Sequence, residues 1–354
     1  MRVLFLIGNG FDLHVGLETG YPEFLKYYLQ QPLPDGVDEL GGRFINRLKG
    51  SIKQDIDLWS SLELQYGKYM SNLGKMGSAE YTLQEEFDII NDDIREKLSS
   101  FIEKEDKRSF FSDDAINVFL EDIINPFQNL RDYEKIEISN RKSNTWNLTR
   151  NRIDFITFNY TRTIEHLLKK QSLHFSGYEI NEPVHVHGYY NDRMILGVND
   201  ASQIDNASLR GSSYFTDALV KAECNHSYGI SHTNQCRDLI YNSQLLCCYG
   251  LSFGDTDKLW WKMICDVLRQ RSDLIVVLFK FVDSLPNYSN NGHKRQDYMR
   301  RVKDHFLLQG GAQEKEKSPL AQRIYVSLND PIFNIHVDNR TPIERLIDTP
   351  ESKF

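Results

Sequence analysis

The chain has 354 residues, a formal net charge of −8 and 40% apolar residues. This length is enough for two domains with substantial hydrophobic cores. An acidic chain lacks the basic surface that non-specific binding to nucleic acid or anionic membranes requires, so we expect neither partner. We also expect a cytoplasmic protein. Only five apolar residues follow Met1-Arg2, no apolar run is as long as a membrane span, and the five cysteines suit a reducing compartment.

The first 25 residues combine an apolar run with a glycine-containing turn. Residues 3–7 are Val-Leu-Phe-Leu-Ile, which is typical of a buried strand in a parallel sheet. Gly8 and Gly10 follow directly and would let the backbone approach a ligand closely. A helix beginning near Phe11 would direct its free N–H groups at the same turn, where they could bind phosphate. This order is how nucleotide-binding α/β domains begin, although the same spacing of glycines also closes ordinary turns.

Residues 35–150 have a different character. Apolar residues recur there at helical spacing between charged positions, which predicts three to five amphipathic helices. Glycine, serine and charged residues at 74–78 and 103–109 predict hinges within this block. We therefore expect an all-helical domain over 35–150, inserted into a domain formed by 1–34 and 151–354.

Strand signals return after residue 151 and alternate with helical ones. The expected strands cover residues 153–158, 184–187, 194–200, 245–249, 274–281, 323–328 and 333–337, with helices at 162–170, after 257 and at 293–308. Residues 310–318 are expected to form a loop. The alternation predicts a doubly wound, mostly parallel α/β sheet with helices on both faces.

Four of the expected strands end in small or polar residues. These clusters are residues 8–10, 159–161, 187–188 and 250–257. Parallel strands bring their carboxyl ends to one edge of the sheet, where ligands bind at the point at which the strand order reverses. We therefore expect the four clusters to share one ligand site.

At these positions the sequence resembles the bacteriophage abortive-infection AbiH family. The motifs that carry the resemblance are Gly8-Asn9-Gly10-Phe11-Asp12, Phe158-Asn159-Tyr160-Thr161, Val186-His187-Gly188, Leu196-Gly197-Val198-Asn199-Asp200 and Tyr249 to Asp257, with Trp59 and Glu63 in the helical block. The family is in turn similar, at the strand ends alone, to the SIR2-like NAD-binding fold. The resemblance implies NAD as substrate or ligand, no metal, and a SIR2-like doubly wound domain.

The same resemblance implies roles for individual residues. His187 would be the base, and Asn159 would orient the ribose or a water molecule. The cofactor would contact Gly8, Asn9, Gly10, Phe11, Asp12, Tyr160, Thr161, Gly188, Gly250, Ser252, Phe253, Asp255 and Asp257. The zinc module that SIR2-like protein deacylases carry after the His-Gly pair is missing, which favours cleavage of NAD itself over protein deacylation.

Elementary chemistry agrees with this division of roles. Breaking the nicotinamide–ribose bond gives an oxocarbenium-like sugar and a neutral leaving group, so the site must orient the ribose and admit water. A histidine can take a proton from water or from a ribose hydroxyl. Three alternatives stay open: one of His185 and His187 is structural, Asn159 serves only a turn, and Asp12, Asp255 or Asp257 caps a helix.

The leading expectation is an antiphage effector that hydrolyses NAD during abortive infection. A catalytically silent nucleotide-binding sensor or scaffold is the alternative from another class. A nuclease is a third possibility, which the acidic composition disfavours. A phage-derived trigger or a partner defence protein and a homo-oligomer are the expected macromolecular partners, and the sequence identifies neither the trigger nor the number of subunits.

Overall fold

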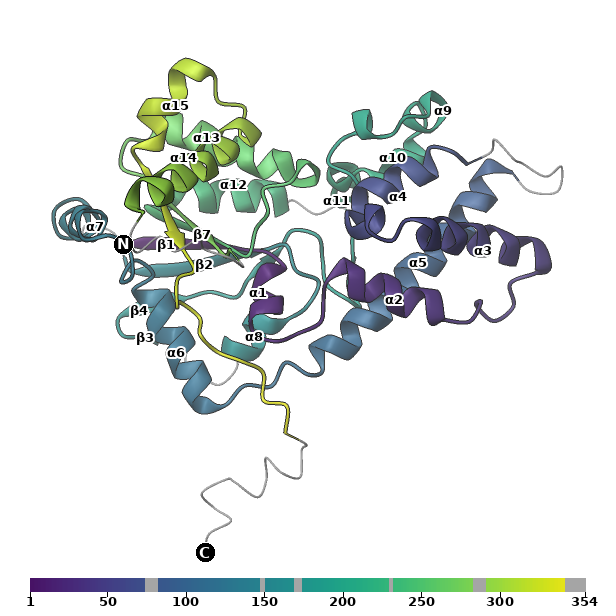
Figure 1. Cartoon of the computed structure of the whole chain (residues 1–354), viewed down its shortest axis with the longest axis horizontal. Helices are drawn as coiled ribbons and strands as arrows, with labels where there is room; N and C mark the ends of the chain where they lie inside the picture. The colour runs from purple at the N-terminus through teal and green to yellow at the C-terminus, as the bar shows by residue number, and fades with distance from the viewer. Residues whose placement is uncertain (74–81, 147–149, 169–173, 229–231, 283–290, 341–354) are drawn as a thin grey trace, which may run out of the picture.

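A computed structural model describes residues 1–73, 82–146, 150–168, 174–228, 232–282 and 291–340 (Figure 1). Its centre is an eight-stranded sheet in the order β3-β4-β2-β1-β6-β7-β8, with β5 also paired to β2. Every pairing is parallel except that of β3 with β4. The strands are β1 (Arg2–Ile7), β2 (Arg152–Thr157), β3 (His174–Phe175), β4 (Tyr178–Ile180), β5 (Val184–His185), β6 (Leu245–Tyr249), β7 (Ile275–Lys280) and β8 (Ile324–Leu328). The predicted doubly wound α/β fold is confirmed.

Strand β1 is the centre of the sheet. Its Phe5 is level with Phe155 of β2 on one side and with Cys247 of β6 on the other. The chain first extends the sheet outward from β1 through β2 to β4 and β5, and then returns to pair β6 with the other side of β1. The strand order therefore reverses between β1 and β6, which is where ligands bind in open parallel sheets.

Helices cover both faces of the sheet, as the uninterrupted apolar strands require. One face packs against α1 (Gly10–His14), α6 (Asp113–Ile124), α8 (Thr163–Leu168) and the segment 332–337, with α7 (Asp132–Asn144) at its edge. The other face packs against α12 (His232–Asn242), α13 (Lys258–Gln270), α14 (Gly292–Gln309) and α15 (Glu314–Ala321). In Figure 1 these two groups lie below and above the strands.

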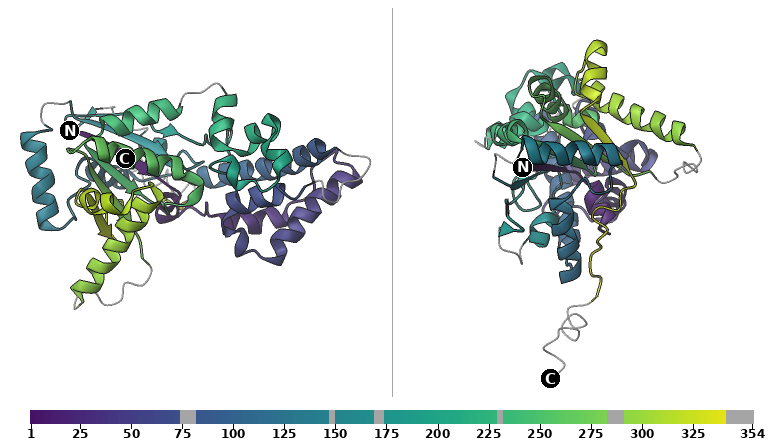
Figure 2. Two further views of the ribbon diagram at one scale, coloured as in Figure 1. Left: turned by 90° about the horizontal axis from the view of Figure 1, so that it is seen from above. Right: turned by 90° about the vertical axis from the view of Figure 1, so that its left-hand side faces the viewer.

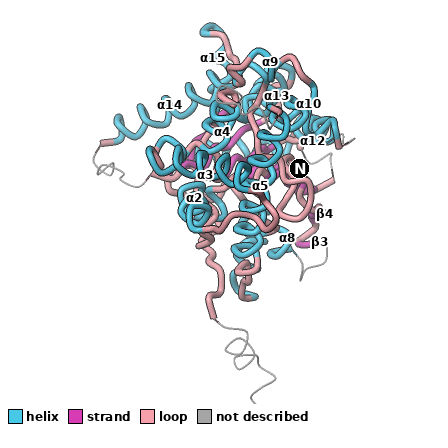
Figure 3. The backbone as a smooth tube through the Cα atoms, turned by 90° about the vertical axis from the view of Figure 1, so that its right-hand side faces the viewer, coloured by secondary structure: helices cyan, strands magenta, loops and turns pink. Residues whose placement is uncertain are grey.

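A second, all-helical lobe extends from the carboxyl side of the sheet (Figure 2, left). Figure 3 looks at this lobe end-on, with the strands behind it. It contains α2 (Tyr21–Gln30), α3 (Glu39–Gln54), α4 (Leu62–Met70), α5 (Leu83–Asp106), α9 (Ala207–Arg210), α10 (Ser213–Leu219) and α11 (Lys221–Ser227), around one apolar core. In the described parts of residues 35–150, five α-helices begin, in agreement with the prediction of three to five. However, α6 and α7 pack on the sheet, whereas α2 and α9–α11 join the lobe. The packing thus groups the helices differently from the expected boundaries at 34 and 150.

Several local predictions were wrong. Residues 194–198 pair only through an isolated bridge between Val198 and Val220. Residues 333–337 form no strand, because Phe333 has a left-handed φ of 58° and packs beneath the sheet. Helix α15 occupies residues 314–318 of the expected loop at 310–318. Helix α5 continues into the expected hinge at 103–109 and ends within it at Asp106. The hinge at 74–78 lies outside the described residues. No helix in the described part is long and apolar enough to cross a membrane.

Three glycines let the loops that follow β1 and β6 touch through their backbones. Gly8 N–H donates to the carbonyl of Tyr249 at 2.9 Å, and Gly10 N–H donates to the carbonyl of Gly250 at 3.0 Å. A Cβ on Gly10 would lie 2.7 Å from the Cα of Gly250, and one on Gly250 would lie 2.5 Å from the nitrogen of Phe11. Gly250 also has a positive φ of 69°. No larger residue fits at this crossing.

We predict that Gly250→Ala lowers the free energy of unfolding by about 3 kcal/mol or more, because a left-handed alanine and a backbone clash combine there. Gly36→Ala is the matched control. Gly36 also has a positive φ, of 80°, but nothing lies within 4 Å of the Cβ that it would gain. Urea unfolding should give a loss of only about 1 kcal/mol for the control. Equal losses in the two variants would show that the close contact is unimportant.

Candidate functional site

The glycine turn after β1 uses its own N–H groups. Gly8 and Gly10 donate to the loop after β6, and Phe11 N–H donates back to the carbonyl of Gly8 at 2.9 Å. Asn9 exchanges hydrogen bonds with Thr19, through the Thr19 hydroxyl at 2.7 Å and the Thr19 carbonyl at 3.2 Å. The expected role of this turn in binding pyrophosphate stays a prediction. In this conformation the donors at Gly8, Gly10 and Phe11 are already bonded within the protein.

Asp12 leads a buried polar cluster at the carboxyl ends of β1 and β2. Its Oδ2 accepts a hydrogen bond of 2.6 Å from the Thr161 hydroxyl, to which the Thr163 hydroxyl donates at 3.1 Å. Burial raises the pKa of Asp12 to about 6, and the hydrogen bond from the Thr161 hydroxyl offsets part of the effect. Asp12 Oδ1 and Asn159 Oδ1 are both buried without a hydrogen-bond partner. Two acceptors are therefore free at this end of the sheet.

His185 is the structural member of the histidine pair. Its Nδ1 lies 3.2 Å from the carbonyl oxygen of Asn159, and its Nε2 lies 3.0 Å from Glu165 Oε1. Burial alone would raise the pKa of Glu165, but the pairing with His185 outweighs burial and lowers it. Both ring nitrogens of His185 are thus occupied, and the ring fixes the main chain at Asn159.

His187 has one occupied nitrogen and one free nitrogen. Its Nε2 lies 2.9 Å from Asp257 Oδ1, while its Nδ1 is buried with no partner. Burial would raise the pKa of Asp257, but Lys221 and His187 outweigh burial and hold it below its usual range. An ionised carboxylate only accepts hydrogen bonds, so the ring proton lies on Nε2. Nδ1 is therefore the ring nitrogen of His187 that is left for a ligand or a water molecule.

Lys221 connects Asp257 to the helical lobe. Its Nζ lies 3.0 Å from Asp257 Oδ1 and 2.9 Å from Glu63 Oε2 of α4. Burial would lower the pKa of Lys221, but the carboxylates of Asp257 and Glu63 raise it above its ordinary value. The sequence drew attention to Glu63 and Asp257 but missed Lys221, since a single lysine in a polar stretch carries no signal of its own.

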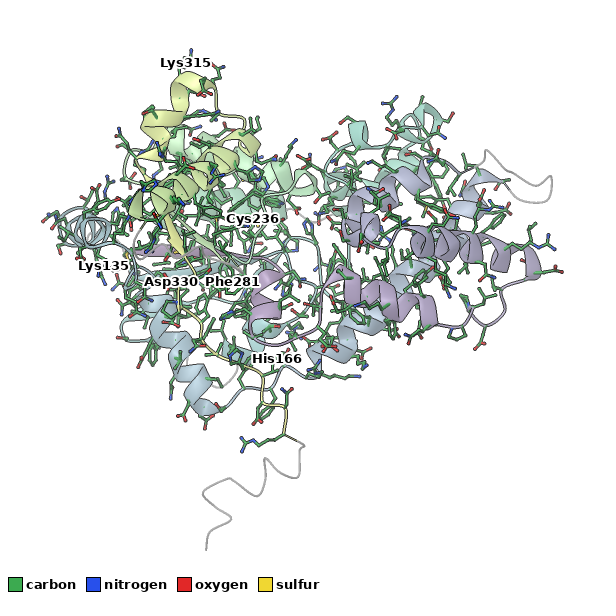
Figure 4. All side chains as sticks on the ribbon, in the orientation of Figure 1. Lys135, His166, Cys236, Phe281, Lys315 and Asp330 are labelled. Atoms are coloured by element: carbon green, nitrogen blue, oxygen red, sulfur yellow. The ribbon has the colours of Figure 1, made fainter. Side chains whose placement is uncertain are left out.

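A cavity of about 600 Å³ opens at the carboxyl ends of β1, β6, β7 and β8. It is lined by Gly10, Leu13, His14, Tyr249, Gly250, Leu251, Ser252, Phe279, Lys280, Phe281, Asn329 and Asp330. Figure 4 labels Phe281 and Asp330, which come from the ends of β7 and β8. The Phe281 side chain is 68% exposed. Three residues of the expected cofactor site, Gly10, Gly250 and Ser252, therefore line a real cavity. Extending the strand-end rule to β7 and β8 could have found the lining residues at 279–281 and 329–330.

Other expected cofactor residues have other surroundings. Phe11 and Phe253 are core residues, and the Phe253 ring packs on those of Trp261 and Phe306. Asp255 is exposed and pairs with Lys258 at 2.7 Å. The Tyr160 hydroxyl donates to the carbonyl of Ile195 at 2.6 Å. Gly188 has a φ of 66° and lies against the backbone of Asp192 and Arg193. Within the described ranges, no three His, Cys, Asp or Glu side chains gather as a metal site would require.

We predict that Asp12 makes stability pH-dependent. Because its pKa in the folded protein is about 6, against an ordinary value of 3.8, folding favours the protonated form. Its contribution is complete below about pH 4 and is lost as pH rises through about 6, a change of about 3 kcal/mol. Asp12→Asn should remove this dependence. Urea unfolding at pH 4 and 7 should show wild type losing about 3 kcal/mol relative to the variant, whereas parallel curves would contradict the assignment.

The comparisons with known proteins identify the family. The family model described as "Bacteriophage abortive infection AbiH" matches residues 4–279. No curated protein matches the chain. The matched region runs from β1 through β7 and therefore includes the glycine turn, Asn159, His187, Lys221 and Asp257. The chain belongs to the bacteriophage abortive infection AbiH family, and its role lies in abortive infection.

Proposed function

We propose that the protein acts in abortive infection by binding NAD and hydrolysing its nicotinamide–ribose bond. One observation carries the proposal. Asn159 Oδ1 and His187 Nδ1 are buried polar atoms without partners, and they follow the adjacent parallel strands β2 and β5. An unsatisfied buried acceptor costs about 1–3 kcal/mol, so two of them at a strand-end edge indicate a ligand that satisfies both.

The strand order supports a dinucleotide as that ligand. Numbered along the chain, the parallel strands run 3-2-1-4-5-6 across the sheet, with β4 and β5 sharing the third place. That order is typical of sheets that bind dinucleotides across the point of reversal. The cavity on the β6 side has the volume of a small-molecule site and offers the rings of Tyr249, Phe279 and Phe281 to a base. We assign the adenosine half to this cavity and the nicotinamide ribose to the Asn159 side.

The chemical step then follows from the free atoms. His187 Nδ1 takes a proton from water, the water oxygen bonds to C1′ of the ribose, and the C1′–N bond breaks with its electron pair passing to nicotinamide. The products are nicotinamide, ADP-ribose and one proton. Asn159 Oδ1 accepts a hydrogen bond from the ribose hydroxyl or from the water. An ionised Asp12 favours the positive charge that develops on the sugar.

A catalytically silent NAD sensor is the second candidate. The observation that favours it is the internal bonding of the Gly8, Gly10 and Phe11 N–H groups, which leaves fewer donors for the pyrophosphate. Under this alternative NAD binds without turnover, and the helical lobe transmits binding to a partner protein.

We predict that His187→Ala and Asn159→Ala each reduce NAD cleavage about 100-fold or more, since each removes one free atom from the reacting site. His305→Ala, which removes an exposed histidine of α14, should leave the rate unchanged. Nicotinamide and ADP-ribose are followed by chromatography, with and without extract from phage-infected cells. Full activity in either site variant contradicts its role. Binding of NAD without product under both conditions favours the sensor.

We also predict that Phe281→Ala weakens NAD binding about 5- to 30-fold, because stacking of a base on an aromatic ring contributes about 1–2 kcal/mol. Leu308→Ala is the control, since Leu308 is 62% exposed but does not line the cavity. Isothermal titration with NAD measures both variants. Equal affinities of wild type and Phe281→Ala for NAD would contradict the assignment of adenosine to this cavity.

A further inference from the structure

A continuous line of charges joins the helical lobe to the free base of the site. Glu63 of α4 contacts Lys221 of α11, Lys221 contacts Asp257 before α13, and Asp257 contacts His187 after β5. All three distances lie between 2.9 and 3.0 Å. Glu63, Lys221 and His187 are each less than a tenth exposed, so bulk water screens their charges only weakly.

The shared ammonium group makes the two carboxylates competitors. Lys221 Nζ and His187 Nε2 both contact the same oxygen, Asp257 Oδ1. Glu63 neutralises part of the positive charge of Lys221. That part cannot also offset the negative charge of Asp257. The less the charge of Asp257 is offset by Lys221, the more strongly Asp257 stabilises the imidazolium form of His187.

We propose that Glu63 and Lys221 form a charge switch through which the helical lobe sets the protonation of His187. The inference rests on the proposed function and concerns the regulation of the same site. Lys221 is a positioning residue, since it acts on His187 only through Asp257. A trigger that moves the lobe and separates Glu63 from Lys221 would leave Lys221 to Asp257 alone and so favour the neutral form of His187 over the imidazolium form.

The other groups around this line do not substitute for Glu63. Tyr21 and Tyr160 adjoin Glu63 and Asp257, but burial and these carboxylates raise the pKa of both phenols well above the usual value, so both stay neutral. His185 is hydrogen-bonded to Glu165 and to the carbonyl of Asn159. Asn225, which donates to the carbonyl of Val186 next to His187, carries no charge.

The test uses substitutions that shift the titration of His187 in opposite directions. Glu63→Gln removes a negative charge, so the acid-side midpoint of the activity profile should fall by about 0.5–1 pH unit. Lys221→Met removes a positive charge, so the midpoint should rise by a similar amount. The double variant removes one charge of each sign and should return close to wild type. KM for NAD should stay constant throughout.

Glu86→Gln is the matched control. Glu86 is another buried carboxylate of the lobe, and it pairs with Arg47 at 3.4 Å, whereas Lys221 pairs with Glu63 and Asp257. It should leave the midpoint unchanged. If Lys221→Met fails to fold because Glu63 is left unpaired, Glu63→Gln and the double variant still decide the question. A purely structural role predicts lower stability without opposed shifts, and that result would overturn the switch.

A second readout separates this inference from the proposed enzyme activity. In protein labelled with ¹⁵N-histidine, the His187 ring signals are identified by their loss in His187→Gln and are titrated directly. Opposed shifts without NAD cleavage would support the switch and refute hydrolysis. Cleavage by wild type with identical His187 titrations in all variants would support hydrolysis and refute the switch.

Discussion

The backbone contact between the loops after β1 and β6 is the constraint on which the site depends. It exists only because Gly8, Gly10 and Gly250 have no side chains, and it fixes the place where the strand order reverses. On one side of it lie the ends of β2 and β5 with Asn159 and His187. On the other side, the ends of β6, β7 and β8 surround the cavity. The glycine contact thus lies between the polar ends of β2 and β5 and the cavity at the ends of β6, β7 and β8.

The polar groups on the first side differ in how completely they are satisfied. His185 has partners on both nitrogens and acts as a support for Asn159, whereas His187 is held by one nitrogen and offers the other. Buried supports normally have every polar atom paired, because an unpaired one is costly. The difference between two histidines only two residues apart is therefore a chemical argument for which of them meets a ligand.

The sequence was most informative where hydrophobic pattern decides structure. Residues 3–7 and 245–249 are predicted as strands because uninterrupted apolar runs favour a sheet that is covered on both faces. Residues 153–158 follow the same pattern, although Asp154 and Thr157 interrupt the apolar run. The prediction of a strand at 333–337 is wrong because this irregular segment places Phe333 in the core beneath the sheet. Tertiary packing determines this conformation, and the local sequence pattern does not. The predicted strand that begins at residue 194 is wrong for a similar reason, since it has only one bridge, from Val198 to Val220, in place of a neighbouring strand.

The gathering of polar strand ends at one edge of the sheet was predictable in outline, but the contacts between them were not. The rule that ligands meet strand ends singles out Asn159, His187 and the loop at 250–257 as candidates, yet it gives no means of seeing that Lys221 of α11 binds Asp257. Nor did it reveal that the N–H groups of the glycine turn bond internally. Both facts depend on contacts between segments far apart in sequence, and those contacts define what the helical lobe can control.

In the proposed function, one dinucleotide spans the Asn159 side of the sheet edge and the cavity at the ends of β6, β7 and β8. The most direct measurement is a crystal structure with a carbocyclic NAD analogue, in which the bond to nicotinamide cannot be hydrolysed. We expect the adenine against Phe281 in the cavity, and the carbocyclic ring that replaces the nicotinamide ribose within hydrogen-bonding distance of Asn159 Oδ1 and His187 Nδ1. An analogue bound with Asn159 and His187 untouched, or with the cavity empty, would contradict the claim.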